Sequence, residues 1–266
     1  MNQNVLTSII VALLLVAGGW LYFGKDMKEE GTKKNVDMLL GSGSHDVATE
    51  ETEYFAGAKG YFAYPTEAGN YPGVVMIHEW WGLNGNIKDM ARELASHGYQ
   101  VLAVDLYKGE VADTAERART LVSSLDQTEA NENLKSAVAH LRNQNAAKIA
   151  SLGWCFGGGQ SLQLSLSGEE LDGTIIYYGS LVTDQNKLGA ISWPVLGIFG
   201  AEDTSIPVES VNQFHGALDS LGVMNQVHVY PGVGHAFANP SGANYAPEET
   251  ADAWQKTLAF LAQTLK

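Results

Sequence analysis

The sequence predicts an α/β fold in which a mostly parallel sheet is covered by helices on both faces. Short apolar runs, such as 73–78 and 101–104, are typical of strands that are buried inside a parallel sheet. Between such runs the apolar residues recur at helical spacing, as over 87–97 and 112–145. Strands that alternate with helices in this way build a parallel sheet between two helical layers.

The elements follow from this pattern in chain order. The expected strands are 58–64, 73–78, 101–104, 148–152, 173–178, 195–199 and 226–230. The expected helices are 87–97, which Gly98 ends as a C-terminal cap, two within 112–145, one from Gln160 and a last one over about 247–265. These elements make residues 53–266 a single globular domain.

Residues 1–24 are predicted to be an N-terminal transmembrane anchor or signal segment. Residues 5–24 are uncharged and mostly apolar, and a helix of that length spans about 30 Å, enough for a bilayer. Trp20, Tyr22 and Phe23 stand at its end, where an aromatic belt would lie. An uncleaved anchor is favoured over a cleaved signal peptide because no basic residue precedes the run and the small-residue cleavage site is weak.

The membrane side rests on two cues that conflict. The lysines at 25, 28, 33 and 34 all follow the apolar run, and the positive-inside rule would then keep the rest of the chain in the cytoplasm. An apolar segment ahead of one globular domain is more commonly an export signal. We therefore expect a membrane-anchored or exported protein with an extracytoplasmic catalytic domain. Residues 25–52 would be a flexible stalk, because they mix charges with Gly and Ser and show no period.

Composition argues against several kinds of function. The chain is 45% hydrophobic and 17% charged, as in ordinary globular proteins. Its formal net charge is −14, with 30 acidic against 16 basic residues, which disfavours a nucleic-acid partner. There is one cysteine, so no disulfide can form within the chain, and the seven histidines lack ligand spacing. We expect no metal site.

The stretch Gly153-Trp154-Cys155-Phe156-Gly157 carries the strongest chemical signal. It lies between a predicted strand and a predicted helix, where a Gly-x-nucleophile-x-Gly turn exposes the middle side chain. The N-terminus of the new helix favours thiolate, and the backbone N–H of Phe156 is placed to receive an oxyanion. Cys155 is therefore the candidate nucleophile; a small buried structural cysteine is the alternative.

Two loops after later strands supply a candidate acid and base. Asp203 follows the sixth predicted strand and His235 follows the seventh. The order Cys155, Asp203, His235 is the one expected of the α/β-hydrolase architecture. His235 would take the thiol proton and later activate water, while Asp203 would hold the imidazole in its working tautomer. The rivals are Glu202 for the acid and His228, which lies within a strand, for the base.

The loop that follows the strand 73–78 holds two further candidates. In this architecture the second oxyanion donor comes from the loop after an early strand, which makes the backbone N–H of Trp80 the candidate. Glu79 is a carboxylate at the end of an apolar strand. We expect it to belong to the site; an exposed loop acid is the alternative.

With these motifs in place, residues 54–266 resemble the dienelactone hydrolase family of α/β-hydrolases. The matching stretches are His78-Glu79-Trp80-Trp81-Gly82-Leu83-Asn84, Asp105-Leu106-Tyr107, Gly153-Trp154-Cys155-Phe156-Gly157-Gly158, Asp203, and Gly234-His235-Ala236-Phe237. The resemblance implies a triad of Cys155, His235 and Asp203 that needs no cofactor. It also implies that Glu79 controls the protonation of the thiol.

The chain departs from the family where the substrate would be held. Members that act on dienelactone bind its carboxylate with one arginine after the Asp-Leu-Tyr stretch and another after the histidine. Lys108 or Gly109 stands in the first place here and Asn239 in the second. The family's named substrate is therefore not implied.

We expect a hydrolase of small esters or lactones that works through a thioester on Cys155. The residues expected to contact substrate are Trp81, Tyr107, Lys108, Trp154 and Phe237. One alternative is a thiol redox protein, which the lack of a resolving cysteine disfavours. The other is a non-catalytic binding module on a hydrolase scaffold, against which the intact triad argues.

Overall fold

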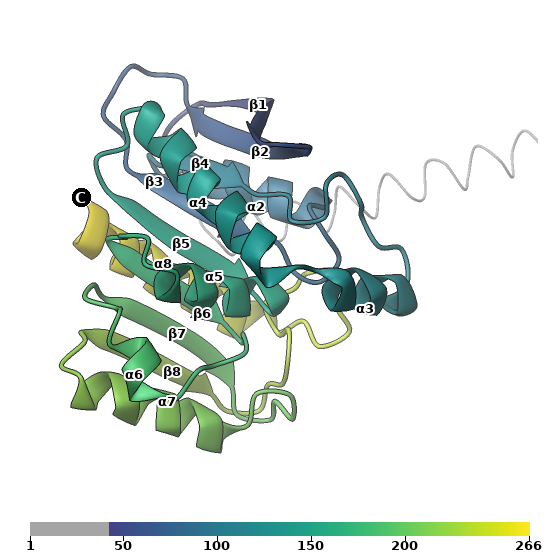
Figure 1. Cartoon of the computed structure of the whole chain (residues 1–266), viewed down its shortest axis with the longest axis vertical. Helices are drawn as coiled ribbons and strands as arrows, with labels where there is room; N and C mark the ends of the chain where they lie inside the picture. The colour runs from purple at the N-terminus through teal and green to yellow at the C-terminus, as the bar shows by residue number, and fades with distance from the viewer. Residues whose placement is uncertain (1–42) are drawn as a thin grey trace, which may run out of the picture. The chain divides into compact units, whose positions relative to one another are not determined.

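The computed structural model describes residues 43–266, which form one sheet flanked by helices (Figure 1). The sheet has eight strands in the order β1-β2-β4-β3-β5-β6-β7-β8. Strands β3 to β8 run parallel to one another. Strand β1 pairs with β2, and β2 pairs with β4, in antiparallel fashion. The strand bounds are β1 Val47–Phe55, β2 Ala58–Pro65, β3 Gly73–Ile77, β4 Gln100–Ala103, β5 Ile149–Trp154, β6 Gly173–Tyr177, β7 Val195–Gly200 and β8 Asn225–Tyr230. The predicted mostly parallel α/β sheet is confirmed.

The helices cover both faces of the sheet. Figure 1 shows α4 and α5 on the near face and α8 on the far face. Every residue of β3, β4, β5, β6 and β7 is buried between these layers, which explains why the strands are continuous apolar runs. The helix bounds are α2 Gly85–Ser96, α3 Ala115–Ser124, α4 Gln127–Asn143, α5 Phe156–Leu166, α6 Gln185–Leu188, α7 Val208–Ser220 and α8 Pro247–Leu265.

The first strand differs from expectation. Residues 47–52, assigned to the stalk from the sequence, form the larger part of β1 and pair with β2. Four of these six residues are polar and none is buried, which suits an edge strand that pairs on one side only. No apolar run marks such a strand in the sequence.

No helix within residues 43–266 is long and apolar enough to cross a membrane. Helix α8 has 19 residues, but it carries Glu248, Glu249, Asp252 and Lys256. The predicted membrane-anchored or exported localisation therefore has no support in this part of the chain, and we withdraw it. The predicted anchor, residues 1–24, and the first part of the predicted stalk lie outside the described residues.

The parallel strands bring their carboxyl ends to one edge of the sheet. Strands β3 and β5 are neighbours, and so are β7 and β8. The loops that leave these four strands hold Glu79, Cys155, Asp203 and His235. In open α/β sheets, ligands bind at the carboxyl ends of the strands.

Candidate active site

Cys155 sits on a strained turn between β5 and α5. Its backbone has φ 54° and ψ −117°, a left-handed conformation that non-glycine residues rarely adopt. The flanking glycines are required by space. A Cβ on Gly153 would lie 2.1 Å from the Gly157 carbonyl oxygen, and one on Gly157 would lie 2.3 Å from the Ile77 carbonyl oxygen. The turn has the geometry of a nucleophile elbow.

Cys155, His235 and Asp203 are joined by hydrogen bonds, although they come from three separate loops. His235 Nε2 lies 3.1 Å from Cys155 Sγ, and His235 Nδ1 lies 2.7 Å from Asp203 Oδ2. The carboxylate can only accept, so Nδ1 carries the proton and Nε2 is free to accept the thiol proton. The rival residues lie elsewhere: Glu202 is exposed and His228 lies within β8.

The second oxygen of the Asp203 carboxylate is held by the backbone. Asp203 Oδ1 accepts hydrogen bonds from the N–H groups of Ser205, at 2.7 Å, and Ile206, at 3.0 Å. The side chain is fully buried, whereas that of His235 is 28% exposed. Asp203 is thus fixed in the orientation that faces the imidazole, and the imidazole remains open toward the solvent side of the site.

The thiol of Cys155 is hard to ionise in this environment. Burial raises its pKa to about 12, and the charges of Glu79 and then Asp203 act in the same direction. Backbone N–H groups of Phe156 and Trp80 bond to the sulfur and act the other way. The helix N-terminus therefore does not make Cys155 a resting thiolate, contrary to the tendency that the sequence indicates. Phe156 and Trp80 are the two backbone donors that the sequence predicts at this point.

Glu79 is a buried acid, not an exposed loop residue. It is 5% exposed, and burial raises its pKa from an ordinary 4.5 to about 7. Asn239 Nδ2 donates a hydrogen bond to Glu79 Oε2 at 2.5 Å and lowers the pKa by a smaller amount. Asn239 Oδ1 in turn accepts from the backbone N–H of Ser241 at 2.9 Å.

Asn239 is the site residue whose contact the sequence did not reveal. Asn239 occupies the place where the family resemblance leads one to expect an arginine. From the sequence alone it therefore indicates only that this positive charge is absent. In the structure it is a neutral partner of Glu79 across 160 residues of chain. Its position four residues after His235, in the same loop, is the one signal that could have pointed to it.

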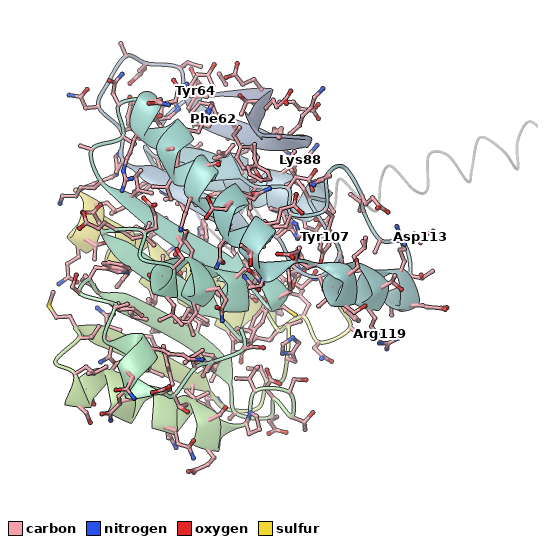
Figure 2. The ribbon with its side chains drawn as sticks, viewed as in Figure 1. Phe62, Tyr64, Lys88, Tyr107, Asp113 and Arg119 are labelled. Carbon is pink, nitrogen blue, oxygen red and sulfur yellow. The ribbon has the colours of Figure 1, made fainter. Side chains whose placement is uncertain are left out.

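The residues expected to contact substrate divide into two groups. Tyr107 packs on Phe156, the residue next to Cys155, with ring centroids 5.7 Å apart, and Trp81 packs on Trp80 at 4.9 Å. Figure 2 shows Tyr107 at the edge of the sheet where β4 ends. Burial and the charge of Cys155 raise the pKa of its hydroxyl.

The other three lie in the core or on the surface. Trp154 is 5% exposed and packs on Tyr177, whose hydroxyl donates to the Ala253 carbonyl of α8. Phe237 is fully buried against Tyr178. Lys108 forms an ion pair with Glu129 at 2.5 Å on the surface. These side chains belong to the core and to the surface rather than to the space above the thiol.

Among residues 43–266, no group of three or more His, Cys, Asp and Glu side chains could hold a metal ion. An eight-stranded, mostly parallel sheet with a nucleophile elbow at its carboxyl edge defines an α/β-hydrolase.

Comparison with known proteins identifies the family within that class. The family model described as the dienelactone hydrolase family matches residues 58–265. A protein of Saccharolobus solfataricus, provisionally named a carboxymethylenebutenolidase, is 30% identical over 73% of this chain and 90% of its own length. A Salmonella typhimurium protein with the same provisional name is 31% identical over 76% of this chain and 82% of its own length.

A solved structure agrees with these relatives. The crystal structure of a provisionally named dienelactone hydrolase from Klebsiella pneumoniae superposes with a TM-score of 0.71 at 27% identity, covering 82% of this chain and 99% of that one. The chain belongs to the dienelactone hydrolase family, and it is a hydrolase.

Proposed function

We propose that this hydrolase cleaves small ester or lactone substrates through Cys155, His235 and Asp203, with a thioester as the acyl-enzyme. One observation carries the proposal: His235 bridges Cys155 Sγ and Asp203 Oδ2 at 3.1 and 2.7 Å. A nucleophile, a base and a group that orients the base, within hydrogen-bond reach of one another, are the requirements of covalent acyl transfer. The relatives' provisional name also denotes an activity on a lactone.

In the first half-reaction, His235 Nε2 takes the thiol proton as Sγ attacks the acyl carbon. The negative charge that develops on the carbonyl oxygen is received by the N–H groups of Trp80 and Phe156, which already bond to the sulfur at rest. When the tetrahedral intermediate collapses, the carbon–oxygen bond of the ester breaks. His235 then gives its proton to the leaving alkoxide, which in a lactone stays attached to the acyl group.

In the second half-reaction, His235 accepts a proton from water as that water attacks the thioester. The carbon–sulfur bond breaks, the acid leaves, and the proton returns to Cys155. Asp203 stabilises the imidazolium, and its two oxygens are held in place by His235 and by the backbone of Ser205 and Ile206.

Glu79 regulates the resting thiol in this proposal. When it is ionised, its charge opposes the formation of a second anion on Cys155. The free enzyme therefore keeps Cys155 as a thiol, which reacts slowly with oxidants and alkylating agents. The thiolate forms only as His235 takes the proton during attack.

Hydrolysis of p-nitrophenyl esters and small lactones by the wild type, Cys155→Ala and Cys155→Ser tests the proposal. We expect turnover by the wild type, none above background for Cys155→Ala, and an acyl adduct on Cys155 in rapidly quenched samples analysed by mass spectrometry. Turnover that persists in Cys155→Ala would show that another group is the nucleophile.

A further inference from the structure

His78 is a buried, titratable side chain that the reaction above leaves without a role. It follows β3 directly and is completely inaccessible to solvent. Its Nδ1 lies 2.6 Å from the carbonyl oxygen of Glu79, and its Nε2 lies 3.2 Å from the backbone nitrogen of Leu106. The ring thus connects the loop after β3 with the loop after β4.

The two backbone partners fix the tautomer of the ring. The Leu106 N–H can only donate, so Nε2 must be the unprotonated nitrogen. The Glu79 carbonyl can only accept, so Nδ1 carries the hydrogen and donates it. Burial lowers the pKa of His78, which keeps the ring neutral and preserves both bonds.

The Glu79 carbonyl belongs to the same peptide unit as the Trp80 N–H. A trans peptide is planar, so its C=O and N–H point in opposite directions. A bond that fixes the direction of the Glu79 carbonyl therefore fixes the direction of the Trp80 N–H, which bonds to Cys155. We propose that His78 is the positioning residue of the oxyanion hole, holding the Trp80 N–H toward the reacting carbonyl oxygen. This inference rests on the proposed function.

Ring contacts bring the second donor into the same arrangement. The imidazole stacks near-parallel to the Phe156 ring, with centroids 5.9 Å apart, and contacts Tyr107 at 4.7 Å. Phe156 supplies the other N–H that bonds to the sulfur. The His78 ring thus contacts both Phe156 and the peptide unit that carries the Trp80 N–H.

A second bond reaches the same carbonyl but is weaker. The N–H of Gly82 donates to the Glu79 carbonyl at 3.2 Å, inside the loop itself. That bond closes a local turn, and it moves with the loop. The 2.6 Å bond from His78 starts at the end of a fully buried strand, so it ties the peptide to the sheet.

Two amide substitutions separate the bonds of His78. In His78→Asn the side-chain NH₂ stands where Nδ1 stood, so it can donate to the Glu79 carbonyl while the Leu106 N–H loses its acceptor. In His78→Gln the amide stands where Nε2 stood, so it can accept from Leu106 while the Glu79 carbonyl loses its donor. Ile77→Val is a matched control, since it loosens the fully buried end of β3 without touching either bond.

The measurements are kcat and KM for p-nitrophenyl acetate, together with the limiting rate of Cys155 alkylation by iodoacetamide at high pH, a reaction that builds no oxyanion. Loss of a whole oxyanion donor costs about 10²- to 10³-fold in kcat. Because the Trp80 N–H is turned rather than removed, we expect about 10- to 100-fold lower kcat for His78→Gln. KM and the limiting alkylation rate should be nearly unchanged, and His78→Asn and Ile77→Val should stay within about threefold of wild type.

Equal decreases in kcat in His78→Asn and His78→Gln, or a change in KM without a change in kcat, would overturn the proposal and leave His78 a structural residue. If His78→Gln does not fold, His78→Asn decides alone: a kcat within about threefold of wild type supports the proposal, and a tenfold fall overturns it. A wild type without esterase activity would instead count against the proposed function, so the two failures are distinguishable.

Discussion

Replacement of Glu79 by glutamine should change how the stability of the protein depends on pH. Glutamine has nearly the same shape as glutamate, and its carbonyl oxygen can still accept the hydrogen bond from Asn239. The substitution therefore removes a titration with little effect on packing. Any difference in pH dependence between the two proteins belongs to the Glu79 carboxyl group.

The size of the effect follows from the raised pKa. Burial moves the pKa of Glu79 from 4.5 to about 7, so the folded state binds this proton more tightly than the unfolded state does. The associated stability is fully present below pH 4.5 and is lost as the pH rises through about 7. From these two pKa values, the free energy of unfolding of the wild type should fall by about 2.5 kcal/mol from pH 5 to pH 8 relative to that of Glu79→Gln.

Urea unfolding at pH 5, 6, 7 and 8 measures this difference directly. Titrations of other groups are common to both proteins and cancel in the comparison. Glu202→Gln is the control, because it removes a charge of the same sign from an exposed position at the same edge of the sheet. A difference between wild type and Glu79→Gln that stays flat from pH 5 to pH 8 would refute the raised pKa and the regulatory role built on it.

Three further outcomes are expected. Asp203→Asn should lower kcat by about 10⁴-fold through the wrong imidazole tautomer, while Glu202→Gln stays near wild type in the same esterase assay; the opposite result would exchange their roles. Glu79→Gln should move the pH midpoint of iodoacetamide alkylation of Cys155 downward, since a charge that opposes the thiolate is gone; an unchanged profile would place Glu79 out of reach of the sulfur. Neutral esters should have higher kcat/KM than matched analogues with a free carboxylate, because Lys108 is paired with Glu129 and Glu79 carries a neutral partner. A preference for the anion that disappears in Lys108→Ala would contradict that reasoning. So would one that disappears in Arg119→Ala: Arg119 lies on α3 (Figure 2), and its guanidinium carbon is 5.9 Å from the centroid of the Trp80 ring.

The central strands could be predicted because burial on both faces leaves them few polar positions. The expected runs 73–78 and 195–199 match β3 and β7 to within one residue, and the expected last helix matches α8. Strand β1 could not be found in this way. None of its residues is fully buried at the edge of the sheet, and most of them are polar, so its sequence resembles that of a polar linker.

Some features of the candidate site are likewise encoded by neighbouring residues, whereas others depend on segments that are distant in the sequence. The elbow around Cys155 is specified within five residues, and the loops of Asp203 and His235 are marked by the strands before them. The bond between Glu79 and Asn239 depends on how two loops approach each other across the sheet edge, which no local pattern encodes. Trp154 and Phe237 were expected in a pocket because an aromatic side chain in the core looks the same in a sequence as one in a cleft.

The charges around the sulfur determine when Cys155 is ionised to the thiolate. Burial, Glu79 and Asp203 all oppose a free thiolate, whereas the N–H groups of Phe156 and Trp80 favour it. In the proposed mechanism, a proton moved from Cys155 to His235 creates a thiolate next to an imidazolium, which the Asp203 carboxylate, 2.7 Å from Nδ1, stabilises. The transfer adds no net charge to the site, so it costs far less than releasing the proton to water. In the proposed mechanism the thiolate therefore forms only during attack, and the N–H groups of Trp80 and Phe156 are needed when the charge passes from the sulfur to the substrate oxygen.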